Sequence, residues 1–188
     1  MPLVLDTPPA TTPVTLAQAK AHLKVDDAAE DALIADLIAA ATRRIEAVCA
    51  LAFITQGWRL LSDCWPRKGV VRIPLYPLQA VQSVKVLTET GLQTVDPAAW
   101  EADTIGRPAR LRALAAFPAP ADRMNVYEIA FTAGFGDAPA DVPADLKQAV
   151  LLTVAHWFEH REGRDAPGLK GLPAEARAIV RDWREVRV

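Results

Sequence analysis

The fold is decided at residues 125–162, whose sequence is NVYEIAFTAGFGDAPADVPADLKQAVLLTVAHWFEHRE. Residues 126–131 partly alternate in polarity, which is typical of a short half-buried strand. Gly134 and Gly136 follow at once and favour a turn with positive φ angles. Pro143 then stands where a helix tolerates proline, at the head of a long apolar run. The stretch therefore predicts a β-rich middle of the chain that passes into a closing helix, which extends to about residue 162.

Two further helices are predicted upstream of this stretch. Thr15 and Gln18 have the spacing of a capping box, which starts a short helix that ends near Leu23. A second cap signal at Asp27 heads a longer helix, expected over about residues 28–50. Its apolar side chains recur at helical spacing, at positions 33, 34, 37, 38, 41, 45 and 48.

The segment between the second helix and the closing helix is rich in strand signals. Four runs of β-branched or aromatic residues predict strands at 58–61, 70–73, 81–88 and 125–132. Thr90 and Gly91 follow the third run as a hairpin turn. Prolines recur throughout the segment, and proline cannot donate a hydrogen bond to a strand ladder. We therefore expect a small, irregular antiparallel sheet.

The two ends of the chain differ in character. Residues 1–13 carry four prolines, which favour an extended arm that is disordered or becomes ordered against another subunit. Residues 163–173 are rich in glycine and proline and are interpreted as a flexible link. A last helix is expected from about Pro173, with an apolar stripe centred on Trp183. Such a helix docks either into a neighbour's groove or onto its own bundle.

These elements predict an α+β fold with a helical core and an inserted, small antiparallel β-rich block. The core consists of three main helices plus the C-terminal helix. We place the extended arm at 1–13, the helical core at 14–56 and 138–162, and the β-rich insertion at 57–137. Residues 163–188 form the link and a partner-binding helix.

Composition excludes several classes of function. Lys and Arg number 21 against 23 Asp and Glu, so the net charge of −2 argues against a protein that grips nucleic acid by its phosphates. Cys49 and Cys64 form no metal-binding or redox pair, and they suit a reducing compartment. The longest apolar run is too short to cross a bilayer. We expect a soluble protein without membrane contact.

One spacing in the closing helix suggests metal chemistry. His156, Glu159 and His160 have the H-x-x-E-H spacing in which two imidazoles share a helix face and can bind one zinc. A catalytic zinc needs a third protein ligand, and Glu175 is the nearest candidate beyond the link. We therefore favour a structural role for the two histidines, with no metal and no cofactor. A small zinc-dependent hydrolase remains the alternative.

Several segments together resemble the head–tail connector (adaptor) proteins of tailed phages. The resemblance covers about residues 14–162 and depends on the order and spacing of its parts, with no single diagnostic motif. The composition also suits the adaptor of a phage-like gene transfer agent. The matching segments are residues 14–26, 30–34, Glu46, 56–58, 73–78, 127–136, 142–147 and 160–162.

The resemblance implies a structural subunit and not an enzyme. Such subunits form a ring, typically of twelve copies, below the portal protein after DNA packaging. The ring extends the channel for double-stranded DNA, which passes without sequence-specific binding, and it carries the stopper and tail proteins. We accordingly expect the protein in a virion or phage-like particle at the head–tail interface, assembled in the bacterial cytoplasm. A free-standing bacterial binding module is a further alternative.

The resemblance also suggests two sets of contact residues. Terminal segments of such rings reach the portal, so the candidate portal contacts are Ile179, Val180, Arg181, Trp183, Arg184, Val186 and Arg187. A channel wall avoids dense positive charge so that DNA can slide. Four carboxylates are candidates for the lumen, or else form an ordinary solvated helix start: Asp26, Asp27, Glu30 and Asp31.

Overall fold

The computed structural model describes residues 1–160 and 171–184. The chain divides into two compact units. The sheet unit comprises residues 1–9 and 55–135, and the helical unit comprises residues 10–54 and 136–188. Within the described residues, each helix is too short or too polar to cross a membrane.

The helical unit begins with two capped helices. Helix α1 spans Leu16–Leu23, and the capping box between Thr15 and Gln18 is present as predicted. Asp27 caps a short 3-10 turn at Ala28–Glu30, and helix α2 then spans Asp31–Cys49. The predicted apolar stripe is largely buried, since Ile34, Ile38, Ala41 and Ile45 are at most 2% exposed. Helix α2 therefore supplies one wall of the core of this unit.

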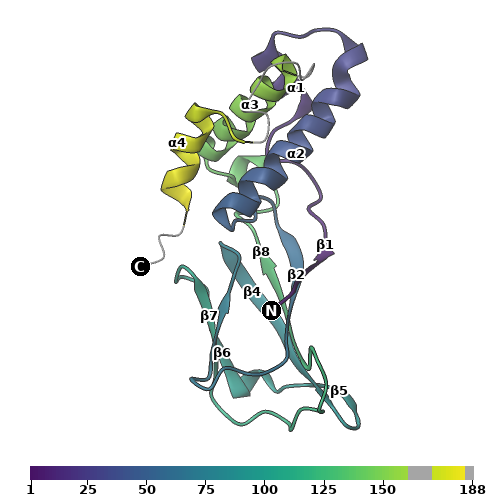
Figure 1. Cartoon of the computed structure of the whole chain (residues 1–188), viewed down its shortest axis with the longest axis vertical. Helices are drawn as coiled ribbons and strands as arrows, with labels where there is room; N and C mark the ends of the chain where they lie inside the picture. Colours follow the sequence, from purple (N-terminus) through teal and green to yellow (C-terminus); the bar gives the residue numbers. More distant parts are fainter. Residues whose placement is uncertain (161–170, 185–188) are drawn as a thin grey trace. The chain divides into compact units, whose positions relative to one another are not determined.

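Two later helices complete the helical unit. Helix α3 spans Ala144–Glu159 after a 3-10 turn at Pro139–Asp141, and helix α4 spans Ala174–Trp183. Figure 1 shows α4 beside α3, and both helices contact α2. The closing helix ends at Glu159 with His160 as its C-cap, and the expected last residues, 161 and 162, lie outside the described residues. The proposed flexible link lies mostly at residues 163–170, outside the described residues.

The larger sheet of the sheet unit is antiparallel, with strand order β1-β2-β8-β4-β5. Its central strand β8 buries every second side chain and pairs with β2 on one side and β4 on the other. The hairpin turn expected at Thr90-Gly91 joins β4 to β5. The strands span Leu3–Thr7 (β1), Gln56–Ser62 (β2), Leu78–Thr88 (β4), Gly91–Thr94 (β5) and Tyr127–Ala133 (β8).

A second, three-stranded antiparallel sheet has the order β3-β7-β6. Its strands span Val70–Ile73 (β3), Trp100–Asp103 (β6) and Ala109–Ala113 (β7). Val71, Ile73 and Leu111 lie on one face and are at most 1% exposed, so this face belongs to the core. Because side chains alternate along a strand, the other face carries the charged residues of the same strands.

The α+β class is confirmed, but the β-rich region is larger than predicted. The described residues hold two sheets instead of one, and β1, β6 and β7 were not predicted. Residues 3–7, expected to belong to an extended arm, pair as an edge strand with β2 of the same chain. Backbone hydrogen bonds to β2 stabilise this edge strand. The prolines of residues 1–13, on which the prediction of an arm was based, give no information about such pairing.

Candidate functional site

The two histidines of the H-x-x-E-H spacing lie at the end of α3. Their ring centroids lie 4.5 Å apart with the planes tilted by 41°, and His160 Nδ1 donates to the carbonyl oxygen of His156 at 2.8 Å. His156 and Glu175 line the same hollow of about 400 Å³. Across residues 1–160 and 171–184, no three His, Cys, Asp or Glu side chains come together in a group able to hold a metal ion. In this arrangement His160 closes the end of the helix.

The acidic residues at the start of α2 already have local partners. Asp31 Oδ1 pairs with Lys20 Nζ at 2.5 Å, and Lys20 also donates to the backbone carbonyl of Asp27. The Asp27 carboxylate accepts from the backbone N–H of Ala29. Lys20 therefore ties α1 to the start of α2, and Asp26 and Asp27 remain exposed to solvent.

Helix α4 lies against its own unit. Val180 is 2% exposed, and its carbonyl oxygen accepts from Cys49 Sγ of α2 at 3.6 Å. Trp183 Nε1 donates to Asp145 of α3 at 2.6 Å. Arg181 and Arg184 are exposed, and Ile179 is half-buried. Val186 and Arg187 lie outside the described residues.

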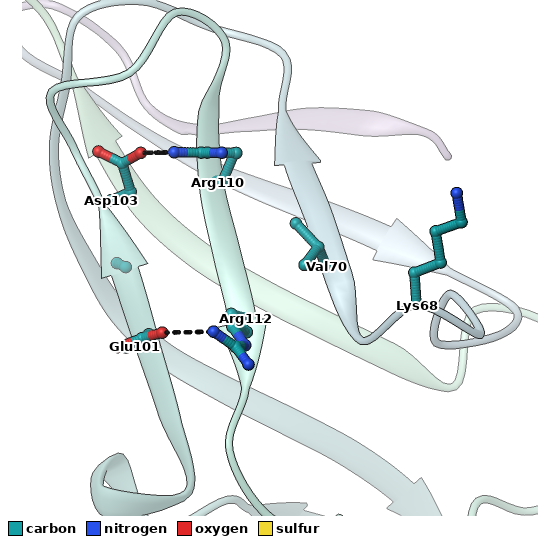
Figure 2. Close-up of a pocket in the computed structure, with 7 residues that line it drawn as sticks. Lys68, Val70, Glu101, Asp103, Arg110 and Arg112 are labelled. Atoms are coloured by element: carbon teal, nitrogen blue, oxygen red, sulfur yellow. Dashed lines mark hydrogen bonds and ion pairs between the residues drawn. The ribbon is translucent and has the colours of Figure 1, made fainter.

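The sequence did not reveal the outer face of the three-stranded sheet. Seven residues line a hollow of about 480 Å³ on this face, and most of them are charged. Figure 2 shows two ion pairs across it, Arg110 with Asp103 at 2.5 Å and Arg112 with Glu101 at 3.7 Å. The alternation of residues 109–113 was the available signal, because it places both arginines on one face of a strand.

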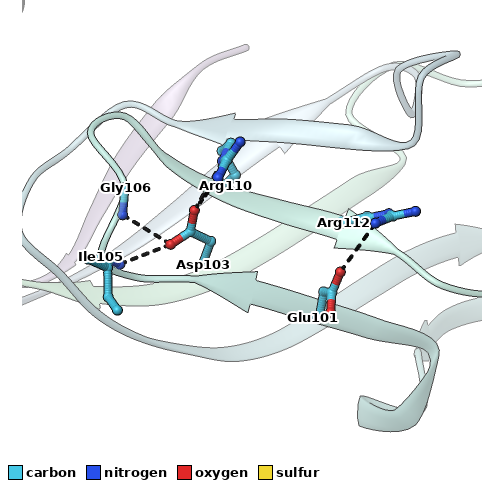
Figure 3. A network of polar contacts seen from close by, with 6 residues as sticks. All are labelled: Glu101, Asp103, Ile105, Gly106, Arg110 and Arg112. Carbon is cyan, nitrogen blue, oxygen red and sulfur yellow. Dashed lines mark hydrogen bonds and ion pairs between the residues drawn. The ribbon is translucent and has the colours of Figure 1, made fainter.

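The turn between β6 and β7 is built around one carboxylate. Asp103 Oδ1 accepts from the backbone N–H groups of Ile105 and Gly106 at 3.1 and 3.0 Å. Asp103 Oδ2 accepts from both Nε and Nη2 of Arg110, as Figure 3 shows. These hydrogen bonds, first that from Arg110, hold the pKa of the Asp103 carboxyl below its ordinary value.

A second line of charges crosses the larger sheet. Arg59 of β2 pairs with Asp6 of β1 at 2.8 Å and with Glu128 of β8 at 3.4 Å, and Lys85 of β4 also reaches Glu128 at 3.5 Å. The hydrogen bond and charge of Asp6 are the main causes that raise the pKa of Arg59. Cross-strand pairs of opposite charge help to fix which strands lie side by side.

Comparison with known proteins supplies the family. The model of the family described as head completion protein matches residues 14–186. No curated protein matches the sequence.

Three solved structures are similar along the whole chain. The neck of an empty gene transfer agent (GTA) particle, computed with C6 symmetry, contains a chain 31% identical with a TM-score of 0.85. The virion of a native GTA particle gives 30% and 0.84, and the neck of a native GTA particle, computed with C12 symmetry, gives 31% and 0.78. Each match covers 100% of this chain and 97% of the other. The chain therefore belongs to the head completion protein family, and it is a structural protein and not an enzyme.

Proposed function

We propose that the chain is a subunit of a neck ring, placed between the head and the tail of a gene transfer agent or a related phage-like particle. One observation carries this proposal: the similarity to chains of GTA necks extends over both units and 100% of the chain. A similarity confined to the helical unit would not assign a function to the sheet unit. The C6 and C12 symmetries named for those necks favour a ring, and we infer twelve copies.

The ring would stand below the portal protein and join the head to the stopper and tail proteins. For the portal contact, the end of α4 offers the exposed Arg181, the exposed Arg184 directly after the helix, and the half-buried Ile179 and Trp183. Val180 is already covered by its own unit. We therefore assign the portal contact to the side of α4 that carries the arginines.

Double-stranded DNA would pass through the ring without being held. The chain's net charge of −2 suits a wall along which phosphates slide. Asp26 and Asp27 are the most exposed of the four proposed lumen residues, while Asp31 is paired with Lys20. The acidic segment before α2 is thus only partly neutralised, which would keep DNA from adhering to it.

The test is removal of the gene from the producing bacterium. We expect heads that lack attached tails in electron micrographs, with tailed particles restored by the wild-type gene. Quantitative mass spectrometry of restored particles should give twelve copies of the chain per particle. Normal tailed particles without the gene, or restored particles that lack the chain, would overturn the proposal. His160→Ala is the matched control and should restore tailed particles fully, because no catalysis is involved.

The portal contact has its own test. The double change Arg181→Glu with Arg184→Glu should reduce the copies of the chain per particle, because it reverses the charge of the exposed side of α4. The double change Arg43→Glu with Arg44→Glu, an equal change of charge at exposed positions of α2, is the control. Equal incorporation of both variants would remove α4 from the portal contact.

A further inference from the structure

We propose that the β6–β7 turn anchors each subunit to the next copy of this chain in the ring, with the Ile105 side chain as the inserted residue. This inference rests on the proposed function and assigns the surface through which neighbouring copies meet. It involves the turn and the charged outer face of the three-stranded sheet, which comprises Lys68, Arg72, Glu101, Asp103, Arg110 and Arg112.

The first argument is the exposure of Ile105. Its side chain is 90% exposed, the highest value among the exposed large apolar residues of the described chain. An apolar side chain that stays in water contributes no burial free energy to the folding of the isolated subunit. A partner that covers it would remove that apolar surface from water.

The second argument is that the turn is held in one shape. Asp103 accepts hydrogen bonds from the backbone N–H groups of Ile105 and Gly106 and is itself held by Arg110 (Figure 3). A Cβ on Gly106 would lie 2.8 Å from Asp103 Oδ2, so the backbone approaches the carboxylate more closely than a side chain permits. A loop fixed before binding loses less conformational entropy when it docks, which favours its use as an anchor.

The third argument concerns the chemistry of the partner. The outer face carries four positive and two negative side chains, so its net charge is +2, and the rest of the chain must sum to −4 because the whole is −2. The remaining residues of another copy therefore carry a net charge of the opposite sign. In a ring of identical subunits each contact joins two different patches, so complementary charge on different parts of one chain is what such a ring needs.

DNA fits this face less well than protein does. Asp103 and Glu101 lie on β6 opposite the two arginines of β7 and pair with them, so phosphates approaching Arg110 or Arg112 also meet carboxylates. The protruding Ile105 presents no charge to a backbone of phosphates. Both features favour a protein surface that has an apolar pocket with acidic residues around it.

The experiment uses assembled particles that carry the photo-reactive residue p-benzoylphenylalanine at position 105. After irradiation, we expect an adduct with twice the 20.4 kDa mass of the chain, and mass spectrometry should find residues of this same chain at both ends of the link. Position 124 is the matched control, because Met124 is also apolar and 81% exposed but lies outside the network of Asp103. It should give at least about tenfold less of this adduct, since it is not an anchor.

An adduct with another particle protein, an adduct with DNA, or no adduct at position 105 would each overturn the inference. Absence of the chain from wild-type particles would instead overturn the proposed function, so the two failures are distinguishable. Ile105→Asp should lower incorporation into particles about tenfold or more, as expected for loss of an interface anchor, whereas Ile105→Val should be incorporated normally. Circular dichroism of the purified Ile105→Asp chain should match the wild type. Normal incorporation of a folded Ile105→Asp chain contradicts the inference.

Discussion

The helical unit and the sheet unit are stabilised in different ways. In the helical unit, α2 and α3 bury continuous apolar stripes, and polar groups serve mainly at the helix ends, as at Thr15 and Asp27. In the sheet unit, each sheet buries one set of side chains and also carries a row of charged side chains. This row includes Arg59 and Glu128 in the larger sheet and Arg110 and Arg112 in the three-stranded sheet.

The charged side chains of the sheet unit indicate where partners can be recognised. Exposed ion pairs contribute little to stability, typically below about 1 kcal/mol each, so the charged lines of the sheet unit are not explained by folding alone. They can set specificity at little cost to the fold.

The largest expected effects test whether both units depend on apolar cores. Phe131→Ala in β8 removes a ring that is 1% exposed and should cost about 3–5 kcal/mol of unfolding free energy. Leu146→Ala in α3 removes a fully buried side chain and should cost about 2–5 kcal/mol. Urea unfolding followed by circular dichroism measures both. Met124→Ala, at an exposed site, should stay within about 0.5 kcal/mol, and a Phe131→Ala cost that small would show that charges hold the sheet unit.

A second substitution tests the packing where the chain enters the helical unit. A Cβ on Gly136 would collide with the Asp141 carboxylate, so Gly136→Ala should cost about 1–3 kcal/mol. The same substitution in an Asp141→Gly background should cost clearly less, because the Oδ2, Cγ and Cβ atoms of Asp141 that collide with the added Cβ are all gone. Equal costs in the two backgrounds would trace the effect to something other than this contact. Thermal unfolding of the four chains completes the cycle.

A third substitution isolates a helix cap in the helical unit. Thr15→Ala removes the acceptor for the Gln18 backbone N–H and should cost about 1 kcal/mol, within a range of about 0.5–2. Thr15→Ser keeps a hydroxyl at the same place and is the matched control. If Thr15→Ala unfolded at the same urea concentration as Thr15→Ser, the cap would not stabilise the helical unit.

The smallest effect concerns the Asp103 turn of the sheet unit and its dependence on pH. Because the pKa of Asp103 is lowered in the folded chain, its stabilising contribution is present above the ordinary carboxyl pKa and is lost as pH falls through the lowered value. Carboxyl NMR should find the midpoint of Asp103 below the ordinary value. Arg110→Ala should move that midpoint upward, since the Arg110 hydrogen bond is the largest cause.

Arg112→Ala provides the control for this titration. Arg112 pairs with Glu101 and not with Asp103, so its removal should leave the Asp103 midpoint nearly unchanged. If Arg110→Ala left the Asp103 midpoint unchanged and Arg112→Ala shifted it, the network would be arranged differently.

The helices could be predicted because their signals are local. The caps at Thr15 and Asp27 and the apolar spacing of α2 need only neighbouring residues, and the structure contains all three. Strand β1 could not be predicted in this way, because it is a strand only through its pairing with β2, whose partner residues lie fifty or more positions later. The prolines around it pointed to an arm, and tertiary pairing outweighed them.

The candidate contact surfaces show the same division. The charged α4 was visible in the sequence because its arginines and its apolar stripe lie on one helix. The Asp103 turn was not, because its geometry requires Arg110 from the next strand as well as two backbone N–H groups. The spacing of His156, Glu159 and His160 was real, but a third ligand depends on parts of the chain distant in sequence.

Strand β1 limits how the sheet unit can be excised or transplanted. The chain leaves the helical unit before residue 55 and returns after 135, and Gln56 pairs with Ala133, so both strand ends are adjacent and a short linker could join them. Residues 3–7 nevertheless belong to the same sheet. Excision of 55–135 would leave an orphan strand at the N-terminus, and a transplant of this sheet to another scaffold requires two separate pieces of gene.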